Sequence, residues 1–149
     1  MIYYVGDHIR IINEIRNYCD ILFIQIESDK DVKFEKGEER PIICEDERAF
    51  IVDNIKGVDF VIIATETDTT TNIKKLLNSG EYNTSDKAIL MRDGYIIDLL
   101  RPNIVFTSTE EPAPEIIKHF CKQMKIKIKT LPVGNGIHTT DIINKCRNL

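Results

Sequence analysis

Short runs of apolar residues recur along the chain without helical periodicity. Three of them are rich in β-branched residues and short enough for buried strands: Ile21–Glu27 (ILFIQIE), Val58–Ala64 (VDFVIIA) and Asn103–Thr107 (NIVFT). A fourth run, Lys125–Leu131 (KIKIKTL), alternates charged and apolar residues, as a strand with one solvated face does. The pattern therefore predicts four strands.

Between these runs, apolar residues recur every three or four positions, which is typical of helices. Helices are predicted over Asp7–Tyr18, Glu45–Lys56, a short segment that holds Ile73 and Leu77 after Asp68 and its threonines, Pro114–Met124 and Thr139–Cys146. Asp7 is the predicted N-cap of the first helix, and Gly57 is the predicted stop of the second. Tyr95–Leu100 predicts one or two further helical turns. The charged segment Ser28–Glu39 predicts a loop, and Asn78–Gly94 gives no clear pattern.

Helices and strands thus alternate along the chain. Such alternation predicts an α/β fold, a Rossmann-like three-layer domain with a mainly parallel sheet. Ligands of these sheets bind at the carboxyl ends of the strands. Neither a GxGxxG nor a GxxxxGK[ST] phosphate loop is present, so other positions must supply any phosphate site.

The composition narrows the class of protein. The 149 residues are 42% hydrophobic and 30% charged, which fits a single globular domain over residues 1–149. A net charge of −4 argues against a nucleic-acid or membrane partner. No apolar run approaches the roughly 18 residues of a membrane span and no secretory signal opens the chain, so we expect a cytoplasmic protein. The widely spaced Cys19, Cys44, Cys121 and Cys146 fit two disulfides or four buried free thiols, and the free thiols are favoured.

The start of the first predicted helix is a candidate phosphate site. Gly6, Asp7 and His8 lie there, and a helix N-terminus attracts anions through its free N–H groups and its dipole. A histidine at this position donates a hydrogen bond to a phosphate, most readily when protonated. The alternative is that Asp7 only caps the helix and His8 lies on the surface.

Two basic residues in the middle of the chain are further candidates. Lys36 lies beside Gly37 in the predicted charged loop, and mobile basic loops close over phosphates. The interleaved glutamates favour the alternative of an ordinary solvated loop. Arg48 follows Glu47 at the start of the second helix, where it either reaches a phosphate or forms a structural ion pair.

A glycine-rich segment follows the last predicted strand. Gly136 leads into a helix whose first turn offers His138, Thr139 and Thr140. Hydroxyl groups together with free N–H groups at a helix start form a phosphate cradle. The alternative is an ordinary capped helix after a turn.

Two blocks of residues, in this order, resemble the cytidylyltransferase-like nucleotidyltransferase family. The first block comprises Ser28-Asp29, Lys36-Gly37, Arg40-Pro41-Ile42, Glu47-Arg48 and Val58-Asp59-Phe60-Val61. The second, Gly136–Ile143 (GIHTTDII), is similar to the family's Gly-x-Ser-Thr-Thr-x-Ile-Ile signature. The resemblance is greatest to the adenylyltransferase domains that form ADP-heptose, followed by glycerol-phosphate cytidylyltransferases. It covers nearly the whole chain apart from residues 80–94.

The resemblance implies a reaction and a set of roles. Enzymes of this family transfer AMP or CMP from ATP or CTP to a small phosphorylated sugar or polyol and release pyrophosphate, with Mg²⁺ offsetting the triphosphate charge. His8 and Lys36 are implied as catalytic residues on the triphosphate. The implied nucleotide-binding residues are Gly6, Arg48, Gly136, His138, Thr139 and Thr140. No residue is assigned as a metal ligand, and the family implies a homodimer.

The match departs from the family at several places. If His8 aligns with the second histidine of the family's His-x-Gly-His motif, Val5 and Asp7 replace its first histidine and its glycine. A shift by one residue restores Gly6 but puts Asp7 at the second histidine. The chain begins inside the loop that follows the family's first strand, so that strand is expected to be missing. Thr107–Glu110 replaces the family's Lys-Gly-Gly-Asp and lacks its cation.

The sequence therefore leaves three hypotheses open. The first is an active nucleotidyltransferase. The second is a binding or interaction module that kept the fold and lost catalysis, which the incomplete amino-terminal motif favours. The third is an unrelated Rossmann-like regulatory domain, for which both motif blocks are coincidental. The enzyme hypothesis predicts that His8, Lys36 and Thr140 converge on one cleft.

Overall fold

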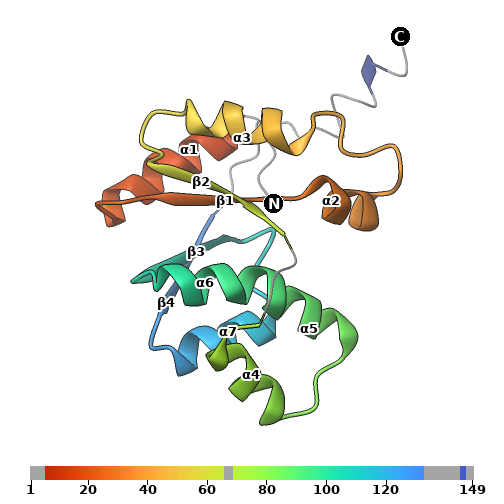
Figure 1. Cartoon of the computed structure of the whole chain (residues 1–149). Coiled ribbons are helices and arrows are strands. Elements are labelled where there is room, and N and C mark those ends of the chain that lie inside the picture. The colour runs from red at the N-terminus through yellow and green to blue at the C-terminus, as the bar shows by residue number, and fades with distance from the viewer. Residues whose placement is uncertain (1–5, 66–68, 133–144, 147–149) are drawn as a thin grey trace. The chain divides into compact units, whose positions relative to one another are not determined.

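The computed structural model of the chain describes residues 6–65, 69–132 and 145–146 (Figure 1). The chain divides into two compact units, the first formed by residues 1–63 with 132–149 and the second by residues 64–131. The predicted last helix, Thr139–Cys146, lies outside the described residues except for its final two positions, which are helical. A single domain over residues 1–149 stays a prediction.

The first unit combines helices with two neighbouring strands. Its described elements are α1 (Gly6–Ile15), a 3-10 turn (Arg16–Tyr18), β1 (Phe23–Glu27), α2 (Asp29–Lys36), α3 (Glu45–Asp53) and β2 (Phe60–Ala64, whose last residue is counted with the second unit). β1 and β2 are neighbours in one sheet, and their arrows run the same way in Figure 1. Most buried apolar side chains of this unit belong to α1 and to β1 with its preceding residue: Ile12, Ile15, Leu22, Ile24 and Ile26.

A polar contact ties the start of β1 to the start of β2. Asp59 accepts a hydrogen bond from the Leu22 amide at 2.7 Å and forms an ion pair with Arg16 at 2.5 Å. The amide hydrogen bond, followed by the Arg16 guanidinium, holds the pKa of Asp59 below its ordinary value. Asp59 of the Val-Asp-x-Val pattern therefore has a structural role in the first unit.

The predicted loop over Ser28–Glu39 is wrong, because Asp29–Lys36 forms helix α2. The Ser28 hydroxyl caps the helix, and Gly37, with a φ of 92°, ends it. Of the eight residues of α2, all described, only Val32 is buried. The segment therefore lacks the apolar periodicity by which a helix is recognised in a sequence.

Other elements of the first unit differ from the prediction only at their ends. α1 begins at Gly6, so Asp7 lies inside the first turn and not before it. α3 ends at Asp53, three residues before the predicted Lys56, because Asn54 has left helical geometry with a ψ of 2°. Each of the two strands begins two residues later than predicted. These shifts leave the predicted order of elements intact.

The second unit also alternates helices and strands. Its elements are α4 (Thr71–Asn78), α5 (Thr84–Ile89), a π-helical turn (Leu90–Gly94), α6 (Tyr95–Leu100), β3 (Ile104–Ser108), α7 (Glu115–Gln123) and β4 (Lys127–Leu131). β3 and β4 pair in parallel, in register from Ile104 opposite Lys127 to Ser108 opposite Leu131. This pairing confirms the parallel strands expected of the α/β fold.

One apolar cluster forms the core of the second unit. Its buried members are Ile73, Leu76, Leu90, Ile97, Ala113, Ile116, Ile117, Phe120 and Cys121. Leu90 comes from the segment without a sequence pattern, which forms α5 and the π-helical turn. A β-carbon on Gly94 would lie 2.7 Å from Leu90 Cδ1, so glycine allows the helix to pass this buried side chain. The segment that interrupts the family pattern is thus part of the core.

The cysteines test one prediction from composition. All four are free thiols, as favoured. Cys121 is buried, whereas Cys44 and Cys146 are exposed and Cys19 is half-buried, so the prediction that all four are buried is wrong. Burial raises the pKa of the Cys121 thiol. Within the described part of the chain, no helix has the length and apolarity needed to cross a membrane.

Candidate functional site

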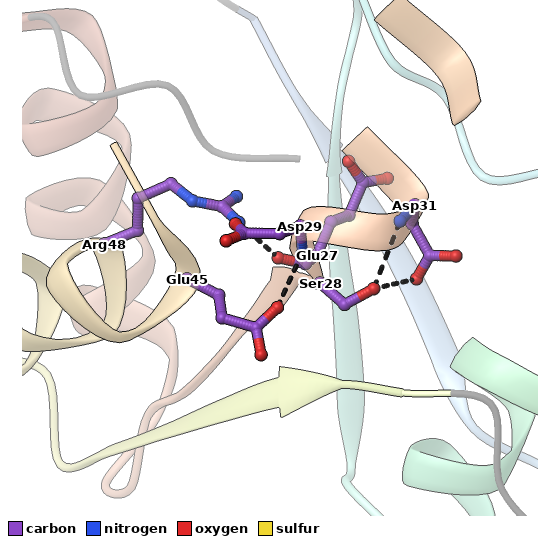
Figure 2. A network of polar contacts seen from close by, with 6 residues as sticks. All are labelled: Glu27, Ser28, Asp29, Asp31, Glu45 and Arg48. Carbon is purple, nitrogen blue, oxygen red and sulfur yellow. Dashed lines mark hydrogen bonds and ion pairs between the residues drawn. The ribbon is translucent and has the colours of Figure 1, made fainter. Parts of the chain in front are cut away.

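A network of polar contacts lies at the carboxyl end of β1 (Figure 2). It joins the last residue of β1, the turn after it, the first turn of α2 and the first turn of α3. Its members are Glu27, Ser28, Asp29, Asp31, Glu45 and Arg48. Because ligands of Rossmann-like sheets bind at this end of the strands, the network is the candidate functional site of the first unit.

Ser28 begins α2. Its hydroxyl oxygen accepts a hydrogen bond from the Asp31 amide at 3.2 Å, and the hydroxyl donates to Asp31 Oδ2 at 2.8 Å. The side chain thus satisfies one of the free N–H groups of the first turn. Ser28 is buried, with 7% of its surface exposed. The Ser-Asp pair of the family pattern therefore serves here as a helix start.

Arg48 reaches back from α3 to this turn. Its Nη2 atom donates to Asp29 Oδ1 at 2.6 Å and to the Glu27 carbonyl oxygen at 2.9 Å. The Arg48 side chain is 12% exposed and that of Asp29 is 32% exposed, so the ion pair is partly shielded from water. Of the two predicted alternatives for Arg48, the structural ion pair is confirmed, and a contact with phosphate stays a prediction.

The side chain of Glu45 binds the main chain of the same turn. Its Oε2 atom accepts a hydrogen bond from the Asp29 amide at 2.6 Å. Glu45 and Arg48 are three residues apart on α3 and therefore lie on one helix face. Asp29 is thus held twice, at its amide and at its carboxylate (Figure 2). Sequence reasoning did not select Glu45, because nothing in its local pattern relates it to a residue sixteen positions earlier.

The network contains four carboxyl groups and one guanidinium, and Arg48 contacts only one of these carboxylates, that of Asp29. The acids are those of Glu27, Asp29, Asp31 and Glu45. An anion meets Coulomb repulsion beside such a set. In addition, the Asp29 and Asp31 amides at the start of α2 already have acceptors. The amino end of α2 is therefore not a phosphate cradle, and cations elsewhere would have to hold a triphosphate.

Lys36 is the predicted catalytic cation that the structure describes in full. It is the last residue of α2, and its side chain is exposed. Gly37 follows it with a β-carbon position that meets no atom within 4 Å. Lys36 thus lies at the opposite end of α2 from the network, with its side chain exposed to solvent.

The other predicted site residues are described less completely. Gly6 and His8 lie in the first turn of α1, and the side chain of His8 lies outside the described part. Gly136, His138, Thr139 and Thr140 lie outside the described residues altogether. The predicted convergence of His8, Lys36 and Thr140 on one cleft therefore stays a prediction.

The carboxyl end of β3 belongs to the second unit and has a different character. The Ser108 hydroxyl oxygen accepts a hydrogen bond from the Glu111 amide at 2.9 Å, and the Thr109 amide donates to the Leu131 carbonyl oxygen at 3.0 Å. This turn holds hydroxyl and carboxyl groups where the family has a lysine. The turn after β3 therefore offers no lysine side chain to a phosphate at the family's position.

A Mg²⁺ site in a protein requires several oxygen ligands around one point. Among those residues, no group of three or more His, Cys, Asp or Glu side chains is placed to hold a metal ion. The acids of the network do not meet this condition, and Asp29 is paired with Arg48. The described residues thus do not fit a protein-bound metal, and Mg²⁺ stays a prediction.

Comparison with known proteins places these features in a family. The model of the cytidylyltransferase-like family matches residues 7–145. The bifunctional protein HldE of Geotalea uraniireducens (strain Rf4) is 37% identical over 141 residues, which cover 94% of this chain and 24% of that protein. The protein of the same name from Desulfatibacillum aliphaticivorans is 25% identical over 142 residues, or 95% of this chain and 24% of that protein. The chain thus spans about a quarter of the length of these relatives.

Solved structures agree on the fold. A lipopolysaccharide core biosynthesis protein from Thermoplasma volcanium GSS1 has a TM-score of 0.58 at 16% identity and covers 88% of this chain and 87% of that chain. Pantothenate synthetase from Thermus thermophilus also has a TM-score of 0.58, at 11% identity, over 95% of this chain and 58% of that chain. At these identities the likeness supports a Rossmann-like α/β fold and nothing more specific.

Proposed function

Because the chain belongs to the cytidylyltransferase-like family, we propose that it transfers a nucleotidyl group, AMP or CMP, from ATP or CTP to a small phosphorylated sugar or polyol. The observation that carries the proposal is the family match over residues 7–145, which includes both motif blocks. The resemblance to the adenylyltransferase domains that form ADP-heptose favours a phosphorylated sugar as acceptor and ATP as donor, and the chain is 37% identical to one bifunctional protein HldE over 94% of its own length. A homodimer, which the family implies, is part of the proposal.

The reaction needs positioning more than covalent chemistry. A phosphate oxygen of the acceptor attacks the α-phosphorus, the bond from that phosphorus to the bridging oxygen breaks, and pyrophosphate leaves. Charge develops on the phosphoryl oxygens, so fixed cations and N–H donors lower the barrier. We assign contacts with the triphosphate to Lys36 and His8, and we assign Thr139 and Thr140 as further phosphate-binding residues. Mg²⁺, when bound to the triphosphate, offsets part of its charge.

A catalytically degenerate binding module is the second candidate. One feature of the described residues favours it: the guanidinium of Arg48, which is the family's basic residue at this position, is already paired with the Asp29 carboxylate. Asp7, in the first turn of α1, adds a further acid beside the proposed phosphate site. A module of this kind binds a nucleotide or a partner without turnover.

Calorimetric titration with ATP and with CTP, each with Mg²⁺, tests binding. We expect a dissociation constant below about 1 mM for one of the two, which corresponds to about 4 kcal/mol of binding free energy. Absence of heat with both triphosphates at millimolar concentration would exclude nucleotide binding. Pyrophosphate release with a panel of sugar phosphates and polyol phosphates then separates an enzyme from a binding module.

Lys36→Ala tests the assignment of the catalytic cation. Loss of a charge-assisted contact to phosphate is expected to weaken triphosphate binding by roughly tenfold. Lys33→Ala is the matched control, since Lys33 is an exposed lysine of the same helix. Equal effects of the two substitutions would mean that Lys36 has no special role.

A further inference from the structure

We propose that Glu45 and Arg48 are positioning residues: they fix the Ser28–Asp29 turn and thereby the direction in which α2 carries Lys36. The proposal rests on the proposed function only for the role of Lys36 toward the nucleotide. It assigns Arg48 an indirect role, in place of the direct phosphate contact that the family resemblance implies.

Helix α2 is short and buries little apolar surface. An isolated helix of fewer than about 12 residues is marginal in water, and α2 has eight residues. Val32 is its one buried side chain, whereas Phe34 is 91% exposed and Lys36 is exposed as well. Because apolar burial holds this helix at one residue only, the polar contacts at its amino end contribute to its orientation.

These contacts act on one residue from two sides. Glu45 accepts the Asp29 amide at 2.6 Å, and Arg48 holds the Asp29 carboxylate at 2.6 Å and the Glu27 carbonyl oxygen at 2.9 Å. Main chain and side chain of Asp29 are thus bound to the same turn of α3. The Val32 amide donates to the Ser28 carbonyl oxygen at 3.0 Å, and this hydrogen bond links the fixed turn to the first turn of α2. We call the Asp29, Glu45 and Arg48 contacts the clamp.

A direct role for Arg48 makes a different prediction. Its buried Nε atom makes no hydrogen bond within the described part, so the side chain retains a donor. If Arg48 bound phosphate, Asp29 would compete for the guanidinium, and removal of the Asp29 carboxylate would strengthen nucleotide binding. If Arg48 acts through the clamp, removal of Asp29 weakens binding in the same way as removal of Arg48.

A double-mutant cycle separates these roles. Calorimetry with ATP and CTP is carried out on the wild type, Arg48→Met, Asp29→Ala and the double variant. We expect each single substitution to weaken binding by about tenfold, and the double variant to be no more than about tenfold weaker than the wild type, because both remove one clamp. Equal or tighter binding by Asp29→Ala, or an additive loss of about a hundredfold, would overturn the proposal. Arg48→Lys replaces Arg48→Met if the latter does not fold.

Amide hydrogen exchange measures the clamp without nucleotide. In Glu45→Ala, exchange of the Asp29 and Val32 amides is expected to be about tenfold faster, and Glu45→Gln, which keeps an acceptor oxygen, is expected to restore slow exchange. Arg16→Met removes an ion pair elsewhere in the same unit and is the matched control. Unchanged protection in Glu45→Ala would overturn the clamp. A wild type that binds neither triphosphate, but shows the exchange effect, would overturn the proposed function and leave the positioning of α2 standing.

Discussion

The two units of the chain differ in the interactions that stabilise each of them internally. The second has one cluster of nine buried residues, with Phe120 and Ile73 fully buried. The first leaves large apolar side chains in contact with water, among them Phe34 at 91%, Phe50 at 66% and Phe60 at 52% exposure. In its described part, polar contacts such as the clamp and the Arg16–Asp59 pair join segments that are distant in sequence. Apolar burial therefore dominates the stability of one unit, and polar contacts order the candidate site of the other.

The largest expected effect comes from the core of the second unit. Phe120→Ala removes a fully buried ring and leaves a cavity, so the free energy of unfolding is expected to fall by about 3–5 kcal/mol. Urea denaturation monitored by circular dichroism measures the loss. Phe50→Ala is the matched control in the first unit, with an expected change of about 0.5 kcal/mol or less because that ring is 66% exposed. Similar losses for both variants would contradict the contrast between the units.

A smaller loss is expected from the clamp. Arg48→Met leaves the Asp29 carboxylate and the Glu27 carbonyl oxygen without their donor, so the free energy of unfolding is expected to fall by about 1–3 kcal/mol. The same denaturation experiment measures it. Lys118→Met removes an ion pair of the second unit whose side chains are 45% and 88% exposed, and should cost about 0.5 kcal/mol or less. A neutral Arg48→Met would show that polar contacts do not stabilise the first unit.

The same contrast explains which elements could be predicted from the sequence. Helix α7 follows from its apolar pattern, because its buried side chains recur at helical spacing. Strand β4 was predicted from its alternating residue types, although Leu131 is its one buried residue. Helix α2 was missed because it buries only Val32. Its signals were the Ser28 cap, acids in the first turn and Gly37 after the last, which do not depend on burial. The π-helical turn was missed because no apolar period describes it.

For the candidate site, the sequence identified residues but not their partners. Arg48 and Asp29 both belong to the block that resembles the family. A structural ion pair was one of two alternatives for Arg48, but its partner Asp29 was not identified. Glu45 was not selected, since its contact with the Asp29 amide depends on how α3 lies beside the end of β1. Side-chain type and spacing predict local contacts, such as the Ser28 cap, whereas contacts across sixteen or more residues require the fold.

The smallest expected effect concerns the polar tie between the strand starts and depends on pH. The pKa of Asp59 lies below its ordinary value of 3.8 in the folded protein, mainly through the Leu22 amide and then through Arg16. A lowered pKa means that the ionised carboxylate stabilises the fold above that ordinary value, and that this contribution is lost as the pH falls through the lower, folded value. The difference in unfolding free energy between the wild type and Asp59→Asn is therefore expected to be largest near neutral pH and to shrink on acidification below about pH 4.

Urea denaturation of both proteins at pH 7, 5 and 3 measures this dependence. Asp53→Asn is the control, because Asp53 is an exposed carboxylate at the end of α3 and takes no part in the tie to Leu22. A difference that stays constant with pH would mean that the charge of the Asp59 carboxylate does not stabilise the fold. A difference that grows on acidification would contradict the assigned direction of the pKa shift. Either result would reduce the part played by charge in the first unit and weaken the contrast with the apolar core of the second.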